Sequence, residues 1–457
     1  MWIERRSVKI LPVAPAGVAL LLYGLLLAPA EDPAAPQRVA VIALGLGGVY
    51  LLMLRLARPL SLFGRDRPTL LALAAAALLV RAAAVIGADT TAPAPPDVFR
   101  CVWEGKLVAE GYNPYAVPPG SSQGEALADD ALYPRMCGHD RASTHPPLAQ
   151  YLFAAAYLLH SESLHGFGLL SLLAELATLL GVIMLAAPLI EKRPFHSWSI
   201  LIYAFSPLVM LEFLRSHHVD ILAMPFFVFS LVRLRRDDAA GTGLLLALAT
   251  LVKPGALLFA AVIFMHFVGR KRLFFLAGLV FPGVLLYLPF GPKAGTHIAE
   301  TIRQFLTQPE FNSSAYRLIA WLSPTEEAAR VIAAGLLLAV VGIAAYPLRE
   351  RVPRVSGRLF IAAAAGVILA PALDAAALVW ILPFVVLYRN LPFLVLTALA
   401  PPAAHVLAAA GGDSAALAWL PALEHAPFYA LLLALLIRSA VRNRQPEEAA
   451  VGNGRSG

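Results

Sequence analysis

The chain has 457 residues, of which 59% are hydrophobic and only 14% are charged, and its formal net charge at pH 7 is +7. A mean hydropathy of +0.72 excludes an ordinary soluble domain and is typical of a polytopic membrane protein. The apolar blocks do not alternate in polarity, which predicts an all-helical bundle and excludes a barrel. Lys and Arg residues lie at the ends of these blocks, so the positive-inside rule explains the charge and no nucleic-acid partner is implied.

Residues 1–68 are predicted to form two transmembrane helices. The basic residues Arg5, Arg6 and Lys9 precede the first helix, but no clean cleavage site follows it, so we interpret it as a retained helix and not as a signal peptide. The four arginines between positions 55 and 67 then mark the cytoplasmic side of the membrane. A third helix must therefore return to the outer side. These three helices are expected at about 10–29, 38–56 and 69–88.

Residues 69–390 are predicted to form the core of the bundle, with polar outer loops at 89–147 and 291–328. The apolar segment 148–160 is too short to cross a hydrocarbon layer of about 30 Å at about 1.5 Å per residue, so we expect a half-helix that enters from outside. Two half-length apolar pieces flank Lys253 and are predicted to form a hairpin that carries this residue to mid-membrane or beyond.

A second pair of short pieces is predicted to turn around Asp374 on the outer side. Residues 391–441 hold the last two helices, and the polar tail 442–457 is expected to be disordered in the cytoplasm. The whole pattern predicts about twelve crossings plus the half-helices, with both termini inside. The remaining predicted helices and pieces are about 165–190, 195–214, 221–233, 243–252, 255–268, 273–290, 329–348, 359–373, 375–387, 391–410 and 425–438.

Asp97 follows three prolines that hold the chain extended as it leaves the third helix. From Asp97 to Leu107 the polar and apolar residues alternate at helical spacing, which predicts a short amphipathic helix lying at the membrane surface. The carboxylates of Asp97 and Glu104 would then project together into a cavity. The alternative is that Asp97 is a solvated helix cap.

His217, His218 and Asp220 precede a predicted helix on the outer side. Histidine and aspartate are ordinary ligands of zinc and manganese, so a divalent metal site is one interpretation. The other is an interfacial cap in which Asp220 accepts hydrogen bonds from the first amides of the helix.

Lys253 is surrounded by apolar residues and followed by a proline. Ionisable groups at membrane depth usually face a functional cavity, and an anionic phosphate is the natural partner of such a cation. Alternatively, Lys253 extends toward the interface or pairs with a buried acid such as Glu175 or Glu212.

Cys101 and Cys137 are the only two cysteines, and both fall in the first outer loop. This placement predicts a disulfide, which would contribute about 3–4 kcal/mol by closing a loop of this size. The alternative is two unrelated small buried residues.

With these residues identified, the chain resembles the polyprenol-phosphate-sugar-dependent glycosyltransferases of the GT-C superfamily, particularly the bacterial polyprenol-phosphate-mannose-dependent mannosyltransferases. The resemblance rests on an ordered series of short motifs between positions 70 and 389, each of which is weak alone. The motifs are Asp97, Phe99-Arg100, Trp103-Glu104-Gly105, Asn113-Pro114-Tyr115, His145 to Gln150, His217 to Asp220, Lys253-Pro254 and Phe311 to Arg317, which includes Asn312.

The resemblance implies a multi-pass protein of the bacterial cytoplasmic membrane that transfers a hexose, expected to be mannose, on the outer face. The donor would be a polyprenyl-phosphate sugar and the acceptor an envelope glycan or lipid, with inversion at the sugar. Asp97 would be the general base, and Glu104 occupies the second acidic position of the family. The residues expected to bind the donor phosphate are Lys253, Arg215 and Arg317. The residues expected to contact substrate are Arg100, Trp103, Asn113, Tyr115, His145, His218, Asp220 and Asn312.

The chain departs from the family at residues 371–377, where a Pro-Trp-Tyr element is replaced by Pro-Ala-Leu-Asp-Ala-Ala-Ala. This difference puts the sugar specificity and even the activity in question. Two other functions therefore stay open. A lipid or sugar transporter also has broken helices and an intramembrane lysine, and a catalytically silent scaffold of envelope assembly would tolerate the missing Trp-Tyr pair.

Overall fold

The computed structural model describes residues 17–19, 21–22, 35–60, 67–86, 96–161, 163–307, 310–346, 355–409 and 420–452. It is 79% helical, and its described residues form no β-strand. A single parallel bridge joins Phe311 to Ala372. The predicted all-helical class is therefore confirmed, while most of the first predicted helix, 10–29, lies outside the described residues.

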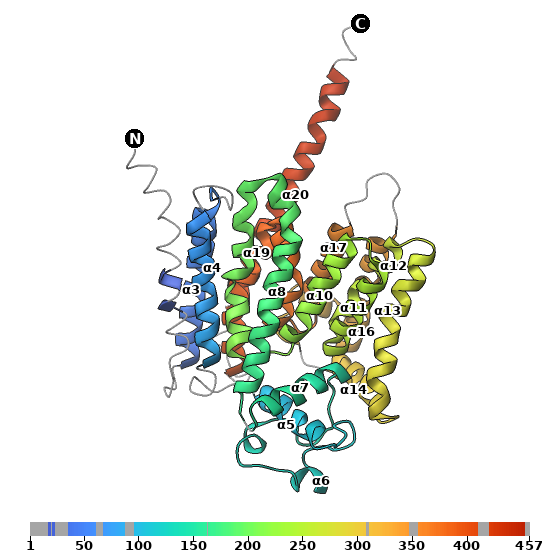
Figure 1. Cartoon of the computed structure of the whole chain (residues 1–457). Helices are drawn as coiled ribbons and strands as arrows, with labels where there is room; N and C mark the ends of the chain where they lie inside the picture. The colour runs from blue at the N-terminus through green and yellow to red at the C-terminus, as the bar shows by residue number, and fades with distance from the viewer. Residues whose placement is uncertain are drawn as a thin grey trace.

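Most of the described helices stand side by side in one bundle, and a smaller group lies across one end of it (Figure 1). In chain order the named elements are α3 (Ala35–Ala57), α4 (Arg67–Ile86), α5 (Pro96–Ala109), α6 (Ser122–Glu125), η1 (Tyr133–Arg135), α7 (Pro147–Leu159), α8 (His165–Lys192), η2 (Pro194–Ser199), α9 (Ile200–Ala204), η3 (Val209–Arg215), α10 (Asp220–Arg235), α11 (Ala239–Val252), η4 (Pro254–Phe259), α12 (Ala260–His266), α13 (Arg270–Tyr287), η5 (Leu288–Phe290), α14 (Ala294–Thr307), α15 (Ala315–Leu322), α16 (Glu326–Ala345), α17 (Val355–Leu369), η6 (Ala375–Ile381), α18 (Leu382–Tyr388), α19 (Leu391–Ala409) and α20 (Leu420–Gly452).

Four helical segments of the described chain are long and apolar enough to cross a membrane: His165–Lys192, Arg270–Phe290, Glu326–Ala345 and Pro421–Ser439. Large apolar side chains also cover the outside of the bundle. On α13, for example, Val280, Phe281, Val284 and Leu285 are all more than half exposed. A surface of this kind is stable only against lipid or another apolar partner, so the chain is a membrane protein.

The bundle is fixed internally by a buried ion pair between α4 and α8. Arg81 donates from Nε and Nη2 to both carboxylate oxygens of Glu175, at 2.6 and 2.7 Å, and both side chains are fully buried. Arg81 Nη1 also donates to the carbonyls of Ala77 and Ala204. Because every one of these donors has an acceptor, the charge is tolerated in the apolar interior.

The elements across the end of the bundle form what we call the loop module, residues 96–160, which contains α5, α6, η1 and α7 (Figure 1). The amphipathic helix predicted from Asp97 is confirmed as α5, and the predicted short helix 148–160 is confirmed as α7, which has 13 residues. The two helices cross at Gly105, where an added Cβ would lie 2.2 Å from the carbonyl oxygen of Phe153. Only glycine permits this close approach.

Both predicted interrupted pairs are present. α11 ends at Lys253, where Pro254 prevents the helix from continuing, and η4 and α12 follow. The second pair, α17 and η6 with α18, is interrupted before Asp374, which caps η6 by accepting from the amide of Ala376 at 3.3 Å. Lys253 and Asp374 stand at these two breaks, and their side chains are 43% and 51% exposed.

Three sequence expectations are corrected. The predicted helix 195–214 is instead a 3-10 segment (η2), a short helix (α9) and a π-type turn (η3), because Pro194 and Pro207 interrupt regular hydrogen bonding. The predicted outer loop 291–328 is largely helical and contains α14 and α15. Finally, α20 continues to Gly452 and so includes the first residues, 442–452, of the segment predicted to be disordered.

Candidate functional site

A cavity of about 550 Å³ lies where the loop module meets the helical bundle. Its wall is built from segments far apart in the sequence: the first turns of α5, the loop before α7, the turn before α10 and the end of α11. Nine residues singled out from the sequence line this cavity: Asp97, Arg100, Cys101, Glu104, Cys137, His145, His217, His218 and Lys253.

Asp97 stands in the first turn of α5, where the partial positive charge of a helix start stabilises a carboxylate. Its side chain is exposed to the cavity, and its Oδ1 accepts a hydrogen bond from the Cys137 thiol at 2.7 Å. Asp97 is the second residue of the helix, so it does not occupy the cap position that the alternative interpretation required. The carboxylate is therefore accessible to a substrate in the cavity.

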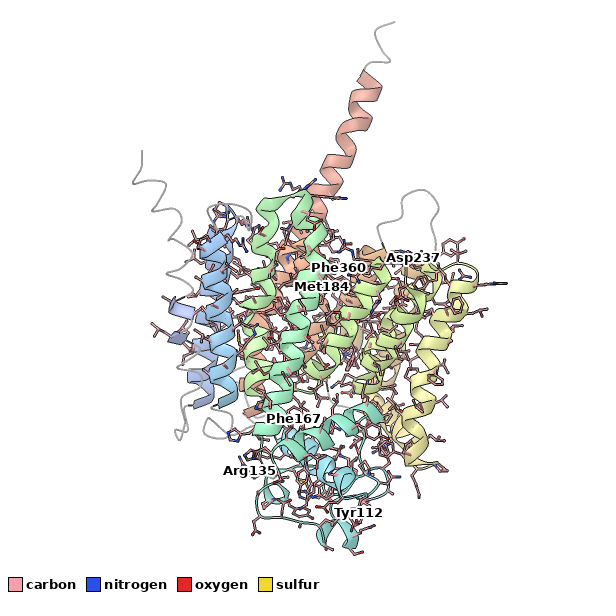
Figure 2. The ribbon with its side chains drawn as sticks, viewed as in Figure 1. Tyr112, Arg135, Phe167, Met184, Asp237 and Phe360 are labelled. Carbon is pink, nitrogen blue, oxygen red and sulfur yellow. The ribbon has the colours of Figure 1, made fainter. Side chains whose placement is uncertain are left out.

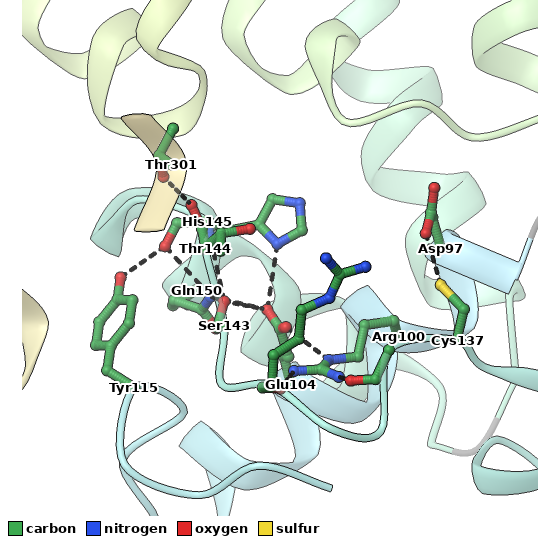
Figure 3. Close-up of polar contacts among 12 residues, drawn as sticks. Asp97, Arg100, Glu104, Tyr115, Cys137, Ser143, Thr144, His145, Gln150 and Thr301 are labelled. Atoms are coloured by element: carbon green, nitrogen blue, oxygen red, sulfur yellow. Dashed lines mark hydrogen bonds and ion pairs between the residues drawn. The ribbon is translucent and has the colours of Figure 1, made fainter. Parts of the chain in front are cut away.

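Glu104 lies two turns further along α5 and is only 2% exposed. Its Oε2 accepts hydrogen bonds from Ser143 Oγ at 2.6 Å and Gln150 Nε2 at 2.9 Å, and it lies 3.3 Å from His145 Nδ1. Its Oε1 accepts from Arg100 Nε at 2.8 Å (Figure 3). Burial by itself would raise the pKa of Glu104, but the hydrogen bonds from His145 and Ser143 and the charge of Arg100 outweigh it and lower the pKa to about 2.

Arg100 joins this network to the loop that follows η1. Its two terminal nitrogens donate to the carbonyls of Gly138, at 2.5 Å, and Arg141, at 2.8 Å. With Nε on Glu104, the guanidinium is held by three acceptors on two sides, and the residue is 7% exposed. Arg100 therefore fixes the cavity wall through three of its five N–H donors, which favours a supporting position.

Lys253 reaches the opposite side of the cavity from the break after α11. Its Nζ lies 3.0 Å from Asp220 Oδ2, and the other oxygen of Asp220 accepts from Trp380 Nε1 at 2.9 Å. Asp220 is 5% exposed whereas the Lys253 side chain is 43% exposed. The buried acid that pairs with Lys253 is thus Asp220, which corrects the sequence alternatives: Glu175 pairs with Arg81, and Glu212 lies beside a histidine.

That histidine is His218, whose Nε2 lies 3.4 Å from Glu212 Oε2 and whose Nδ1 lies 3.9 Å from Asp374 Oδ2. Among the described residues these three offer ligand atoms within 4.8 Å of one another and form a possible metal group. The set differs from the one expected from sequence, because Asp220 is engaged by Lys253 and Trp380 and His217 contacts the ring of Phe167. A doubly protonated His218 would bridge the same two carboxylates without a metal.

The disulfide expected between Cys101 and Cys137 is not formed, since both are free thiols. Cys101 lies on α5 and is 1% exposed, while Cys137 is half-buried and donates to Asp97. Both cysteines line the same cavity, but their sulfurs are not bonded to each other. Burial and the neighbouring Asp97 carboxylate raise the pKa of Cys137 to about 11.

Several predicted contact residues hold the scaffold instead of lining the cavity. Trp103 is fully buried, Tyr115 donates from its hydroxyl to the carbonyl of His145 at 2.7 Å, and Asn113 donates from Nδ2 to the carbonyl of Phe290 at 2.8 Å. These three side chains pin the loop module to itself and to the bundle. These three motif residues therefore stabilise the fold of the loop module and do not line the cavity.

Segment 291–328 contributes Thr307 to the cavity wall, but not the two residues expected from its motif. Asn312 is buried and donates to Glu424 of α20 at 2.6 Å, and the exposed Arg317 pairs with Glu310 at 2.9 Å. Neither residue lines the cavity, and the side chain of Arg215 lies outside the described residues. Of the three predicted phosphate ligands, the structure places Lys253 alone at the cavity wall among those whose side chains are described.

Sequence reasoning missed three polar partners of the site. Trp380 holds Asp220, Ser143 holds Glu104, and Asp374 faces His218. Their separations from these partners in sequence range from 39 to 160 residues, so no local pattern connects them. The one available signal was that Trp380 follows closely on the segment where the family's Trp-Tyr pair is missing.

Comparisons of the chain with known protein families, with curated proteins and with solved structures find no match.

Proposed function

We propose that this protein is an integral membrane glycosyltransferase of GT-C type that transfers a hexose from a polyprenyl-phosphate sugar to a hydroxyl of an envelope glycan or lipid. The observation that carries the proposal is the convergence in one cavity of an exposed carboxylate, Asp97, and a cation on the side of the helical bundle, Lys253. An inverting transfer needs these two groups. A carboxylate accepts the proton of the attacking hydroxyl, and a cation stabilises the charge that grows on the leaving phosphate.

The proposed topology places the loop module outside the cytoplasm, with about twelve crossings in all. The side chains of Tyr112 and Arg135 in the loop module lie at the opposite end of the molecule from Asp237, which directly follows the basic segment 233–236 (Figure 2). Basic loops favour the cytoplasmic side. The cavity therefore sits at the outer boundary of the membrane, where a polyprenyl chain can stay in lipid while its phosphate enters polar surroundings.

In this mechanism Asp97 deprotonates the acceptor hydroxyl as the oxygen attacks the anomeric carbon, and the bond from that carbon to the phosphate oxygen breaks. Lys253 stays paired with Asp220 in the resting protein and is held 3.0 Å from it. When a phosphate arrives, the ammonium has further donors to offer because lysine carries three. The contact with Asp220 thus positions the ammonium of Lys253 and leaves its other N–H donors available to the phosphate.

The test is glycosyl transfer by purified protein in nanodiscs, with radiolabelled polyprenyl-phosphate mannose and an envelope lipid extract as acceptor. Asp97→Asn keeps the shape of the side chain and removes the proton acceptor, so transfer should fall by about 10²–10⁴-fold. The matched control is Asp140→Asn, an exposed carboxylate of the same loop module that does not line the cavity. Equal transfer by wild-type protein and Asp97→Asn refutes the assigned role.

The same reconstituted protein tests the transporter. A flippase moves the labelled lipid between leaflets with no new glycosidic bond, which an accessibility assay on sealed vesicles detects. Lipid movement without any glycosylated product would refute the transferase.

A further inference from the structure

The contact between Glu104 and His145 fixes where the protons of this histidine lie. Glu104 is ionised at every physiological pH because its pKa is about 2, so its oxygens only accept hydrogen bonds. His145 Nδ1 lies 3.3 Å from Glu104 Oε2, and the contact is attractive only when Nδ1 carries a hydrogen. The second ring nitrogen, Nε2, points away from Glu104 (Figure 3), and His145 lines the cavity.

The ring is held in this orientation from several sides. The rings of Phe153 and His145 pack edge to face, with their centroids 5.1 Å apart. The backbone amide of His145 donates to Ser143 Oγ at 3.1 Å, and its carbonyl accepts from the Tyr115 hydroxyl at 2.7 Å. Backbone and side chain are therefore both constrained, while the side chain stays 25% exposed. A constrained ring with one accessible nitrogen is typical of a histidine that serves a ligand.

Among the described side chains, three permanent cations line the cavity: Arg100, Arg141 and Lys253. Arg100 already donates to Glu104 and to two carbonyls, and Lys253 is paired with Asp220, so the protein itself engages two of these three cations. When His145 takes a second proton, the group of Arg100, Glu104 and His145 changes from neutral to positive. The protonated ring then presents an Nε2 hydrogen and a net charge to the cavity.

We propose that His145, oriented by Glu104, donates from Nε2 to the phosphate of the polyprenyl-phosphate donor and that Glu104 is the positioning residue for this contact. The inference rests on the proposed function, and it assigns Glu104 a different role from the second catalytic carboxylate expected from sequence. The phosphate would lie between His145 on the loop-module side and Lys253 on the bundle side. Asp97 remains the proton acceptor.

Other charged groups that face the cavity bear on the pH dependence. From α5 they are Asp97, Arg100 and Glu104; from the loop before α7, Arg141; from the turn before α10, His217 and His218; and from the end of α11, Lys253. Because His217 and His218 also line the cavity, the contribution of His145 is measured as the difference between wild-type protein and a His145 variant.

The experiment measures binding, without turnover, of a polyprenyl methyl phosphodiester to purified protein in nanodiscs at pH 5.5 and pH 8.0. A diester keeps one negative charge over this range, so any pH dependence comes from the protein. Wild-type affinity should fall about tenfold between the two pH values, because the neutral ring keeps its one hydrogen on Nδ1 beside Glu104 and no longer donates from Nε2. His145→Gln should lose this tenfold difference and bind more weakly than wild-type protein at pH 5.5.

The matched control is His139→Gln, a histidine of the same loop module whose Nε2 contacts the carbonyl of Tyr133 at 3.1 Å and which does not line the cavity. This variant should keep the pH dependence of wild-type protein. Glu104→Gln should lose affinity at pH 5.5, because the ring is no longer held. The neutral polyprenol, which lacks the phosphate, should bind every protein independently of pH.

A His145→Gln protein with the same pH dependence as wild-type protein overturns the inference. If the protein transfers sugar but His145→Gln keeps the wild-type pH dependence of binding, only the inference about His145 is overturned and the proposed glycosyltransferase function is unaffected. Binding that depends on His145 without any glycosyl transfer would overturn the proposed function and leave a lipid-phosphate site. Absence of phosphodiester binding in wild-type protein would overturn both.

Discussion

Replacing Glu104 by glutamine should destabilise the loop module strongly, because a single carboxylate organises four partners. Ser143, Gln150 and His145 converge on one oxygen, and Arg100 binds the other. Glutamine keeps the size of the side chain, but its NH₂ group would face donors and the buried Arg100 would lose its counter-charge. Removing one partner of a buried ion pair is costly because the remaining charge stays buried.

The magnitude follows from the pKa of Glu104. Lowering this pKa from 4.5 to about 2 corresponds to about 3 kcal/mol of stabilisation of the ionised group in the folded protein. On the scale of about 2–4 °C per kcal/mol, this predicts a drop of roughly 6–12 °C in the midpoint of thermal unfolding. Because the pKa is lower in the folded state, this stabilisation is present above pH 4.5 and is lost as the pH falls toward 2.

The assay is thermal unfolding in detergent followed by tryptophan fluorescence, since Trp103 lies beside Glu104 on α5 and reports on the loop module. Glu110→Gln is the control, because Glu110 is exposed just beyond the end of α5. Wild-type protein should lose stability between pH 4.5 and 2 in a way that Glu104→Gln does not. An unchanged midpoint in Glu104→Gln at pH 7 would refute the reasoning that this network holds the module.

Two further predictions concern the loop module. Gly105→Ala should destabilise it severely because the new methyl group meets the carbonyl of Phe153 at 2.2 Å, whereas Gly335→Ala on α16, with open space around it, should not; unfolding midpoints measure the difference. Intact-mass analysis of protein purified without reductant should find both thiols free, and alkylation at pH 8 should be faster at Cys137 than at the buried Cys101. Asp97→Asn should accelerate alkylation of Cys137, since the carboxylate contributes to its raised pKa; a disulfide-linked product would contradict the free-thiol arrangement.

The sequence by itself determined the class of the protein and the position of several helix breaks. Apolar blocks of helical length require internal hydrogen bonding in lipid, so an all-helical fold follows from hydropathy alone. The break at Lys253 follows from Pro254, which lacks an amide hydrogen. The spacing from Asp97 likewise predicted α5, because a helix of 3.6 residues per turn gathers those positions on one face.

Only the tertiary structure decided which polar residues meet. Lys253 pairs with Asp220 and not with Glu175 or Glu212, and Glu104 binds His145 across 41 residues of chain. Such pairs depend on how helices cross, and crossings are set by side-chain shape, such as the glycine contact between α5 and α7. Local patterns identify residues able to do chemistry, but packing in three dimensions selects those that share one cavity.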